Sequence, residues 1–177
     1  MQSFSDEHLM KIFQDEKGGH GQIAFDCLYK RYAKIILQYF YFALNNDYNK
    51  AQDFMHDLFV KIIEKPQLFD SSQNFKSWIY RVASNMCKNE YRRNSTNQKY
   101  HSHLKLISEN TASLNDTEKK LRACISQLNQ EHRSLIVLRF KMEMSIKEIA
   151  EILECPEGTV KSRLFYATKE LTKLYKL

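Results

Sequence analysis

Glycine and proline are scarce in this chain, with 4 and 2 copies among 177 residues. Hairpins and barrels need such residues at their many turns, so the scarcity favours helices joined by few turns. Apolar residues recur at steps of three and four, which is the spacing of one face of an α-helix. Because 43% of the residues are hydrophobic, the chain can bury a core. We therefore expect an all-α fold.

The first part of the sequence predicts four helices packed as one bundle. Ser5 caps a short first helix, which Gly18 and Gly19 end. The next three helices are expected at about 22–44, 48–65 and 75–93. Pro66 stops the helix at 48–65, and a polar loop follows at 68–74. The residues expected to face the core are Phe25, Leu28, Tyr32, Ile36, Tyr39, Phe40, Phe54, Leu58, Phe59, Ile62, Phe75, Ile79, Val82, Ala83 and Met86.

A polar segment at 94–115, rich in Ser, Thr, Asn, Gln and His, interrupts the helical pattern. Its length of roughly 20 residues is unusual inside a compact domain and favours a tether. We therefore predict a first domain at 1–94, a flexible linker at 95–116 and a second helical domain at 117–177. In the second domain the expected inward residues are Leu121, Cys124, Ile125, Leu128, Leu135, Leu138, Phe140, Ile146, Ile149, Ala150, Leu153, Val160, Leu164, Ala167 and Leu171, with Asn129 capping a helix.

The segment 145–171 has the pattern of a helix-turn-helix. Ser145 and Glu148 fit a capping box, and Pro156 suits the start of a basic last helix that runs to about Tyr175. The second helix of such a motif lies in the major groove of DNA. Its expected outward residues are Glu157, Thr159, Lys161, Ser162, Phe165 and Tyr166, which suit base edges, while Arg163 and Lys169 suit phosphates. A helical hairpin that docks another protein is the alternative.

The net charge of +6 lies entirely within residues 76–105, which contain seven basic residues and a single acid, Glu90. An excess of this kind favours an anionic partner such as nucleic acid, although a solvated basic face is the alternative. Trp78 and Tyr80 lie among the cations Lys76, Arg81, Lys88, Arg92 and Arg93, with Asn85 and Asn89 between them. Aromatic rings among cations suit single-stranded DNA. The competing interpretation places Trp78 in the core and leaves the other side chains solvated.

The polar side of the third predicted helix combines acids, a histidine and a lysine: Asp53, His56, Asp57 and Lys61. Such a face can be merely solvated, or it can dock a basic partner helix through charge pairs.

The sequence offers little support for catalysis, metal binding or a membrane span. No phosphate-binding glycine loop and no hydrolase signature occur. His101 and His103 lack a matching Cys or His pair for zinc, and the four cysteines are spaced as reduced, mostly buried thiols. No apolar run approaches 18 residues, and residues 1–10 are too polar for a targeting segment. We expect a cytoplasmic, non-enzymatic protein without a cofactor.

Two sets of motifs resemble conserved regions of the bacterial extracytoplasmic-function sigma factors, of the sigma-E-like kind. The first set, similar to region 2 of that family, is Ala24-Phe25, Leu28-Tyr29, Arg31-Tyr32, AQDFMHDLF at 51–59 and FKSWIYRVASN at 75–85. The second, similar to region 4, is Leu128, Arg133, Leu138-Arg139, SIKEIAEIL at 145–153 and PEGTVKSRL at 156–164. The resemblance implies a helix bundle and a helix-turn-helix joined by the linker.

The resemblance also implies a function: a sigma factor that binds core RNA polymerase and directs promoter-specific initiation. Such a protein reads the −35 element as duplex and the −10 element as a melted non-template strand with a flipped base. The implied partners are the largest-subunit coiled coil and the beta flap of the polymerase, promoter DNA and an anti-sigma factor. A stand-alone, dimeric helix-turn-helix regulator is the second hypothesis, and a DNA-modifying enzyme is the third.

The site residues carried over from the family fall into three sets. The residues expected to bind core polymerase are Asp53, His56, Asp57 and Lys61. The residues expected to bind −10 DNA are Ser71, Ser72, Gln73, Asn74, Trp78, Arg81, Asn85, Lys88, Asn89 and Arg92. The residues expected to bind −35 DNA are Thr159, Lys161, Ser162, Arg163, Phe165, Tyr166 and Lys169. The chain departs from the family at His56-Asp57, where Gln-Glu is common, and at Tyr166, where arginine is frequent.

Overall fold

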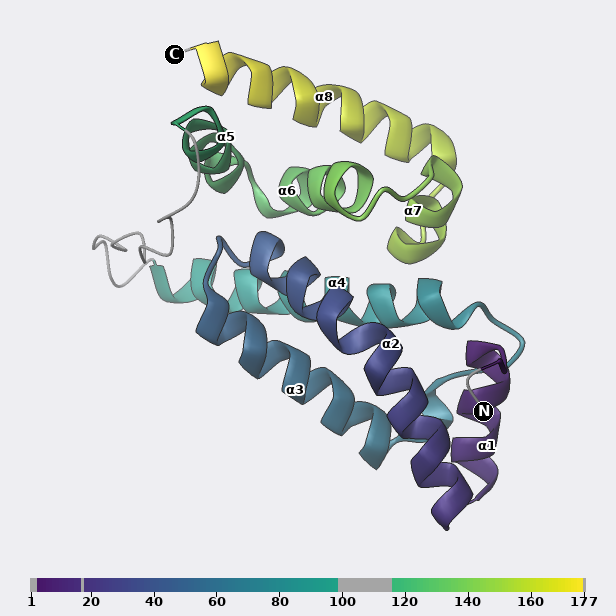
Figure 1. Ribbon diagram of the computed structural model, residues 1–177. Helices are drawn as coiled ribbons and strands as arrows, with labels where there is room; N and C mark the ends of the chain where they lie inside the picture. Colours follow the sequence, from purple (N-terminus) through teal and green to yellow (C-terminus); the bar gives the residue numbers. More distant parts are fainter. Residues whose placement is uncertain (1–2, 17, 99–115, 177) are drawn as a thin grey trace.

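The computed structural model is all-α in the residues it describes, which are 3–16, 18–98 and 116–176 (Figure 1). Its elements are α1 (Asp6–Asp15), α2 (Gly19–Ala43), α3 (Tyr48–Glu64), the short 3₁₀ turn η1 (Pro66–Leu68), α4 (Phe75–Gln98), α5 (Asp116–Gln127), α6 (Gln130–Ile136), the π-helical turn η2 (Val137–Lys141), α7 (Ile146–Leu153) and α8 (Glu157–Lys176). The predicted fold class is confirmed. Most of the predicted linker lies outside the described residues.

The helices form two layers, with α1–α4 in one and α5–α8 in the other (Figure 1). Helix α4 lies along the boundary and packs against α7 and α6, and α2 packs against η2. A single apolar core crosses this boundary, joining Tyr39 and Tyr80 of the first layer to Leu138 and Ile149 of the second. A smaller cluster of Leu128, Ile136 and Ala167 lies within the second layer. The two layers therefore share buried surface, which favours their association.

Local signals in the sequence placed most helix boundaries correctly. The predicted caps are confirmed: the side chain of Ser5 accepts from the backbone N–H of His8, and that of Asn129 accepts from His132. The prediction for Gly18 and Gly19 is wrong, because α1 already ends at Asp15 and Gly18 is the residue that precedes α2. Glycine is tolerated at a helix N-cap as well as past a C-terminus, so its position alone did not distinguish the two.

The inward orientation predicted for Phe140 is also wrong, since its side chain is 58% exposed. Phe140 lies inside the π-turn η2, where the backbone N–H of Met142 bonds to the carbonyl of Val137 at 3.0 Å. Two positions along a helix are separated by roughly half a turn, so Phe140 lies on nearly the opposite side from Leu138. Leu138 remains buried, but Phe140 turns towards solvent.

No helix in the described ranges combines the length and apolarity that crossing a bilayer would require.

Candidate nucleic-acid interface

Helices α7 and α8 form the predicted helix-turn-helix. Ser145 and Glu148 close a full capping box, in which each side chain bonds to the backbone N–H of the other residue. Helix α7 ends at Leu153, and the left-handed backbone of the next residue, Glu154 (φ 51°, ψ 46°), turns the chain sharply towards α8. In αL geometry such as this the chain reverses within a few residues. The buried residues Ile149 and Val160 belong to the core beneath this turn, so the relative placement of the two helices is fixed by packing.

The outer face of α8 carries the residues predicted to contact duplex DNA. Phe165 and Tyr166 are 62% and 58% exposed, and their rings meet edge to face at 5.5 Å. The side chains of Lys161, Ser162, Arg163 and Lys169 are exposed, and that of Thr159 is half-buried. Val160, Leu164 and Ala167 take the opposite, buried side. The helix therefore presents cations and two large apolar rings on one solvated surface, a combination that suits phosphates and base edges.

Arg133 is a buried residue of α6 with a structural role that sequence reasoning did not assign to it. Its side chain is only 5% exposed and donates to the carbonyls of Ile125, Ser126 and Leu128 at 3.2, 2.7 and 2.7 Å. These carbonyls lie at the end of α5, where helical partners are lacking. Burial lowers the pKa of Arg133, but arginine remains charged in proteins. Arg133 therefore joins α5 to α6.

The loop at 69–74 is ordered by its own hydrogen bonds. The carboxylate of Asp70 accepts from the backbone N–H of Ser72 at 2.9 Å, which lowers the pKa of Asp70. The side chain of Asn74 accepts from the N–H of Ser77 at 2.8 Å and so caps α4. Ser71, Ser72, Gln73 and Asn74, which were predicted to bind −10 DNA, are all exposed. The loop is thus a small polar surface at the start of α4.

Helix α4 divides the other predicted −10 residues into two groups. Asn85, Lys88, Asn89 and Arg92 are exposed. Trp78, by contrast, is only 6% exposed and packs its ring edgewise on Phe69, with the centroids 5.2 Å apart. Tyr80 is buried as well. The interpretation of Trp78 as a core residue therefore fits this structure, and neither ring offers a free face for base stacking.

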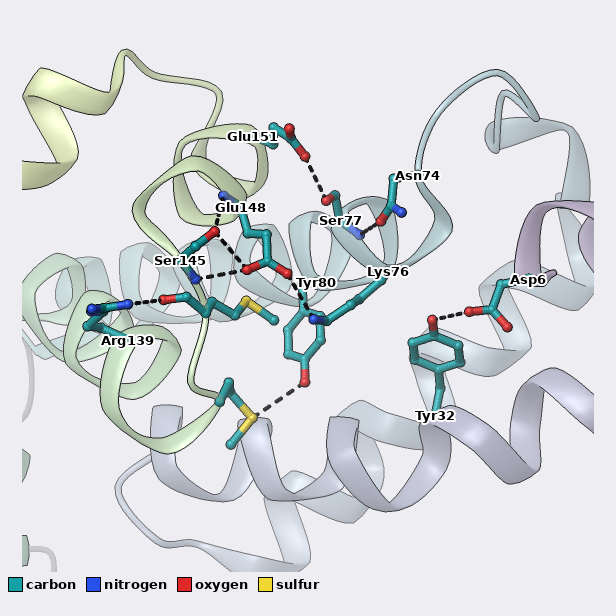
Figure 2. Close-up of polar contacts among 12 residues, drawn as sticks. Asp6, Tyr32, Asn74, Lys76, Ser77, Tyr80, Arg139, Ser145, Glu148 and Glu151 are labelled. Atoms are coloured by element: carbon teal, nitrogen blue, oxygen red, sulfur yellow. Dashed lines mark hydrogen bonds and ion pairs between the residues drawn. The ribbon is translucent and has the colours of Figure 1, made fainter.

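The cationic start of α4 is covered by acids of α7 (Figure 2). Lys76 pairs with Glu148 at 2.9 Å, and the hydroxyl of Ser77 donates to Glu151 at 2.9 Å. One turn further, Arg81 bonds both to Glu154 at 3.1 Å and to Gln73 at 2.7 Å. The pKa of Glu148 is lowered to about 2, first by the backbone N–H of Ser145 and then by Lys76. Lys76, Ser77 and Arg81 are therefore all bonded to carboxylates of α7 and of the residue that follows it.

The polar side chains predicted to face outward from α3 are exposed. Asp53, His56, Asp57 and Lys61 are all exposed on this helix. Two apolar side chains, Val60 and Ile63, also lie in solvent, at 49% and 51% exposure. Sequence reasoning missed them, although their occurrence between the polar positions 57, 61 and 64 was a visible signal. Exposed apolar residues rimmed by charges are typical of protein-binding surfaces.

Among the described residues no group of three or more His, Cys, Asp or Glu side chains could hold a metal ion. His101 and His103 lie outside the described residues. All four cysteines are free thiols; Cys87 and Cys124 are buried, and Cys27 and Cys155 are half-buried. Burial raises the pKa of Cys87 to about 12, so this thiol stays protonated at neutral pH.

Comparisons with known proteins agree with this geometry. Residues 28–96 match the family model for sigma-70 region 2, and residues 118–171 match that for sigma-70 region 4. The RNA polymerase sigma-H factor of Pseudomonas aeruginosa is 30% identical over 85% of this chain and 85% of its own. The extracytoplasmic-function (ECF) sigma factor SigW of Bacillus subtilis is 26% identical over 92% of this chain and 94% of its own.

Two solved structures share the fold. The sigma factor RpoE of Bartonella quintana, crystallised with the anti-sigma factor NepR, matches 84% of this chain and 97% of its own with a TM-score of 0.63 at 22% identity. CnrH, in complex with the cytosolic domain of CnrY, matches 97% of both chains with a TM-score of 0.68 at 20% identity. On the matches to both regions and the 30% identity to a sigma factor over most of both chains, this protein belongs to the ECF-type sigma factors of the sigma-70 family, which direct promoter-specific transcription.

Proposed function

We propose that this sigma factor reads the −35 element as duplex through α8 and the −10 element as a melted non-template strand through the loop at 69–74 and helix α4. The observation that carries the proposal is the exposed face of α8, with Lys161, Phe165 and Tyr166 projecting from a capped helix-turn-helix. A lysine can donate to guanine acceptors, and an aromatic edge can contact a thymine methyl group. Tyr166 cannot make the bidentate guanine contact of an arginine. We therefore expect the preferred −35 sequence to differ from the one that is usual in the family.

The loop is suited to hold an extruded base. Flipping a base out of the stack costs a few kcal/mol, and a polar pocket that is already ordered recovers part of this cost. The Asp70 and Asn74 hydrogen bonds order the loop before DNA arrives. The exposed amides of Gln73 and Asn85 can pair with adenine edges, and Lys88 can follow the phosphates.

The exposed face of α3 would bind core RNA polymerase. Asp53, Asp57 and Lys61 offer charge pairs, and Val60 and Ile63 offer apolar surface between them. Free sigma factor would bind promoter DNA weakly, because each small DNA-binding part makes few contacts and would meet the melting cost unaided. An anti-sigma factor is a further expected partner, since the structurally similar RpoE of Bartonella quintana was crystallised with one.

The test is run-off transcription with core RNA polymerase on a library of promoter fragments, with and without the protein. We expect discrete transcripts only when it is added, with two shared elements upstream of their start sites. A Lys161→Ala variant should change the base preference at the upstream −35 element. Asn85→Ala should change the base preference at the downstream −10 element. Lys173→Ala, an exposed change at the far end of α8, serves as the control.

The opposite outcome is equally informative. If no transcript depends on the protein but the free chain shifts duplex DNA tightly as a dimer, the roles proposed for α3, α4 and the loop are wrong.

A further inference from the structure

Helix α1 is bonded to both ends of the polar loop, although it precedes residues 28–96, which match region 2 of the family. At the near end, the side-chain amide of Gln14 donates to the carbonyls of Pro66 and Phe69 at 2.8 and 2.7 Å. At the far end, the carboxylate of Glu7 accepts from the backbone N–H of Phe75 at 3.0 Å. One short helix thus holds the chain immediately before and immediately after residues 70–74.

Gln14 uses both of its amide donors in these bonds. A primary amide has two N–H donors, and Gln14 directs both at backbone carbonyls. The N–H of Phe75 lies in the first turn of α4, where backbone donors lack helical partners and a negative charge is favoured. Glu7 supplies both a partner and the charge. The same carboxylate-to-helix bond fixes where α4 begins relative to the loop.

Helix α1 is itself seated firmly on α2. The carboxylate of Asp6 accepts from the hydroxyl of Tyr32 and pairs with Arg31, as Figure 2 shows for Tyr32. Leu9 and Met10 of α1 are fully buried in the core. A displacement of α1 away from the loop would therefore break contacts in the core. The loop is held by a rigid element and not by another loop.

We propose that Gln14 and Glu7 are positioning residues for base recognition: from outside the matched region they set the conformation of loop 70–74 and thereby its selectivity for the −10 strand. The inference rests on the proposed function of the loop. Preorganised binding segments gain affinity and selectivity because they lose less conformational freedom on binding. The bonds to Pro66, Phe69 and Phe75 involve only backbone groups of these residues, so Gln14 and Glu7 engage none of the exposed side chains at 71–74.

The experiment uses the full chain bound to core RNA polymerase and fluorescent single-stranded oligonucleotides that differ at each −10 position. Gln14→Leu removes both donors at similar volume, and Glu7→Gln removes the charge but keeps an acceptor oxygen. We expect Gln14→Leu to reduce discrimination between the best and worst base about tenfold, which corresponds to about 1.4 kcal/mol. Glu7→Gln should have a smaller effect in the same direction. Lys11→Ala, an exposed change on the same helix, should match the wild type.

Two further readouts separate positioning from a general loss of folding. Hydrogen exchange of the Ser72 and Gln73 amides, both bonded within the loop, should accelerate in Gln14→Leu. Discrimination at the −35 element and the affinity for core polymerase should not change. The proposal would be overturned if these amides exchanged in Gln14→Leu at the wild-type rate, or if the variant lost −35 and −10 selectivity equally. One outcome would separate the two proposals. If exchange accelerates in Gln14→Leu but the wild-type protein shows no base preference on the melted strand, the proposed function of the loop is wrong, while Gln14 still sets the conformation of the loop.

Discussion

Glu148 connects the local and the tertiary structure at the scale of a single side chain. It closes the capping box with Ser145 and reaches Lys76 on α4. Both contacts favour the carboxylate, so the pKa of Glu148 falls from the ordinary value of 4.5 to about 2. Arg133 is the second such residue, since it satisfies three carbonyls at the end of α5.

The contribution of Glu148 to stability should depend on pH. A carboxyl group whose pKa is lower in the folded state stabilises that state above its unfolded pKa, and this stabilisation is lost as pH falls through the folded pKa. We therefore expect Glu148→Gln to lower Tm above pH 4.5 and to match the wild type near pH 2. Thermal unfolding followed by circular dichroism measures this. Glu64→Gln, an exposed change on α3, is the control. A Tm difference that stays constant down to pH 2 would contradict the assignment.

Replacing Arg133 by methionine should destabilise the protein by about 2–3 kcal/mol, because one buried and two half-buried carbonyls lose a charged donor. Arg133→Lys should recover part of this loss, since an ammonium group can reach fewer of the carbonyls. Arg163→Met, which changes an exposed arginine on α8, should leave stability unchanged. Urea unfolding provides the free energies. Equal stability of Arg133→Met and the wild type would show that water replaces these bonds at little cost.

At the scale of elements, the connection between α1 and α2 leaves no room for a side chain at Gly21. A Cβ atom added at Gly21 would lie 2.0 Å from the backbone oxygen of Glu16, whereas one added at Gly19 meets nothing within 4 Å. Helix α1 can approach α2 only because residue 21 has no side chain. The position of Gln14 and Glu7 beside the loop therefore depends on this glycine as well as on Asp6.

Gly21→Ala should destabilise the protein by about 1–3 kcal/mol, the usual cost of overpacking against atoms that cannot rotate away. Gly19→Ala, two positions earlier in the same helix, should be neutral or stabilising by up to about 1 kcal/mol because alanine favours helix. Chemical unfolding of the two variants checks the difference. If Gly21→Ala proved as stable as Gly19→Ala, α1 would have room to move. Gln14 and Glu7 would then hold the loop less firmly than their hydrogen bonds indicate.

For the whole molecule, the decisive feature is that α7 covers the start of α4. Glu148, Glu151 and Glu154 bond to Lys76, Ser77 and Arg81, and a shared apolar core lies beneath them. If Arg81 contacts −10 DNA, as the resemblance to the family implies, the DNA and Glu154 compete for the same side chain. We then expect the two layers to separate locally when the melted strand binds.

Reversing the charge on α7 should shift this competition towards DNA. In the double variant Glu151→Lys, Glu154→Lys, like charges face Arg81, and the free chain should bind a single-stranded −10 oligonucleotide about three- to tenfold more tightly. Small-angle scattering should show a larger radius of gyration. The matched control, Asp26→Lys with Glu64→Lys, changes the net charge equally on exposed positions of α2 and α3. An equal gain in both double variants would mean that total charge, and not opening, causes the effect.

Local patterns in the sequence determined most of the secondary structure and much of the candidate site. The periodicity of three and four, the caps at Ser5, Asn129 and Ser145, and the low glycine content all act over a few residues, so they could be identified without a fold. The outward face of α8 followed from the same periodicity. The family motifs added roles that no local pattern specifies.

Contacts between residues distant in the sequence were decided only by the tertiary structure. Trp78 has the same local pattern whether it faces DNA or the core, and packing against Phe69 decided in favour of the core. Phe140 stands two positions after the buried Leu138, and the structure places it on the exposed side of the turn. The bonds of Gln14 to residues more than 50 positions away and the pairing of α7 with α4 have no local signature. They arise because folding brings separate helices together, and the partner of a side chain is then set by packing.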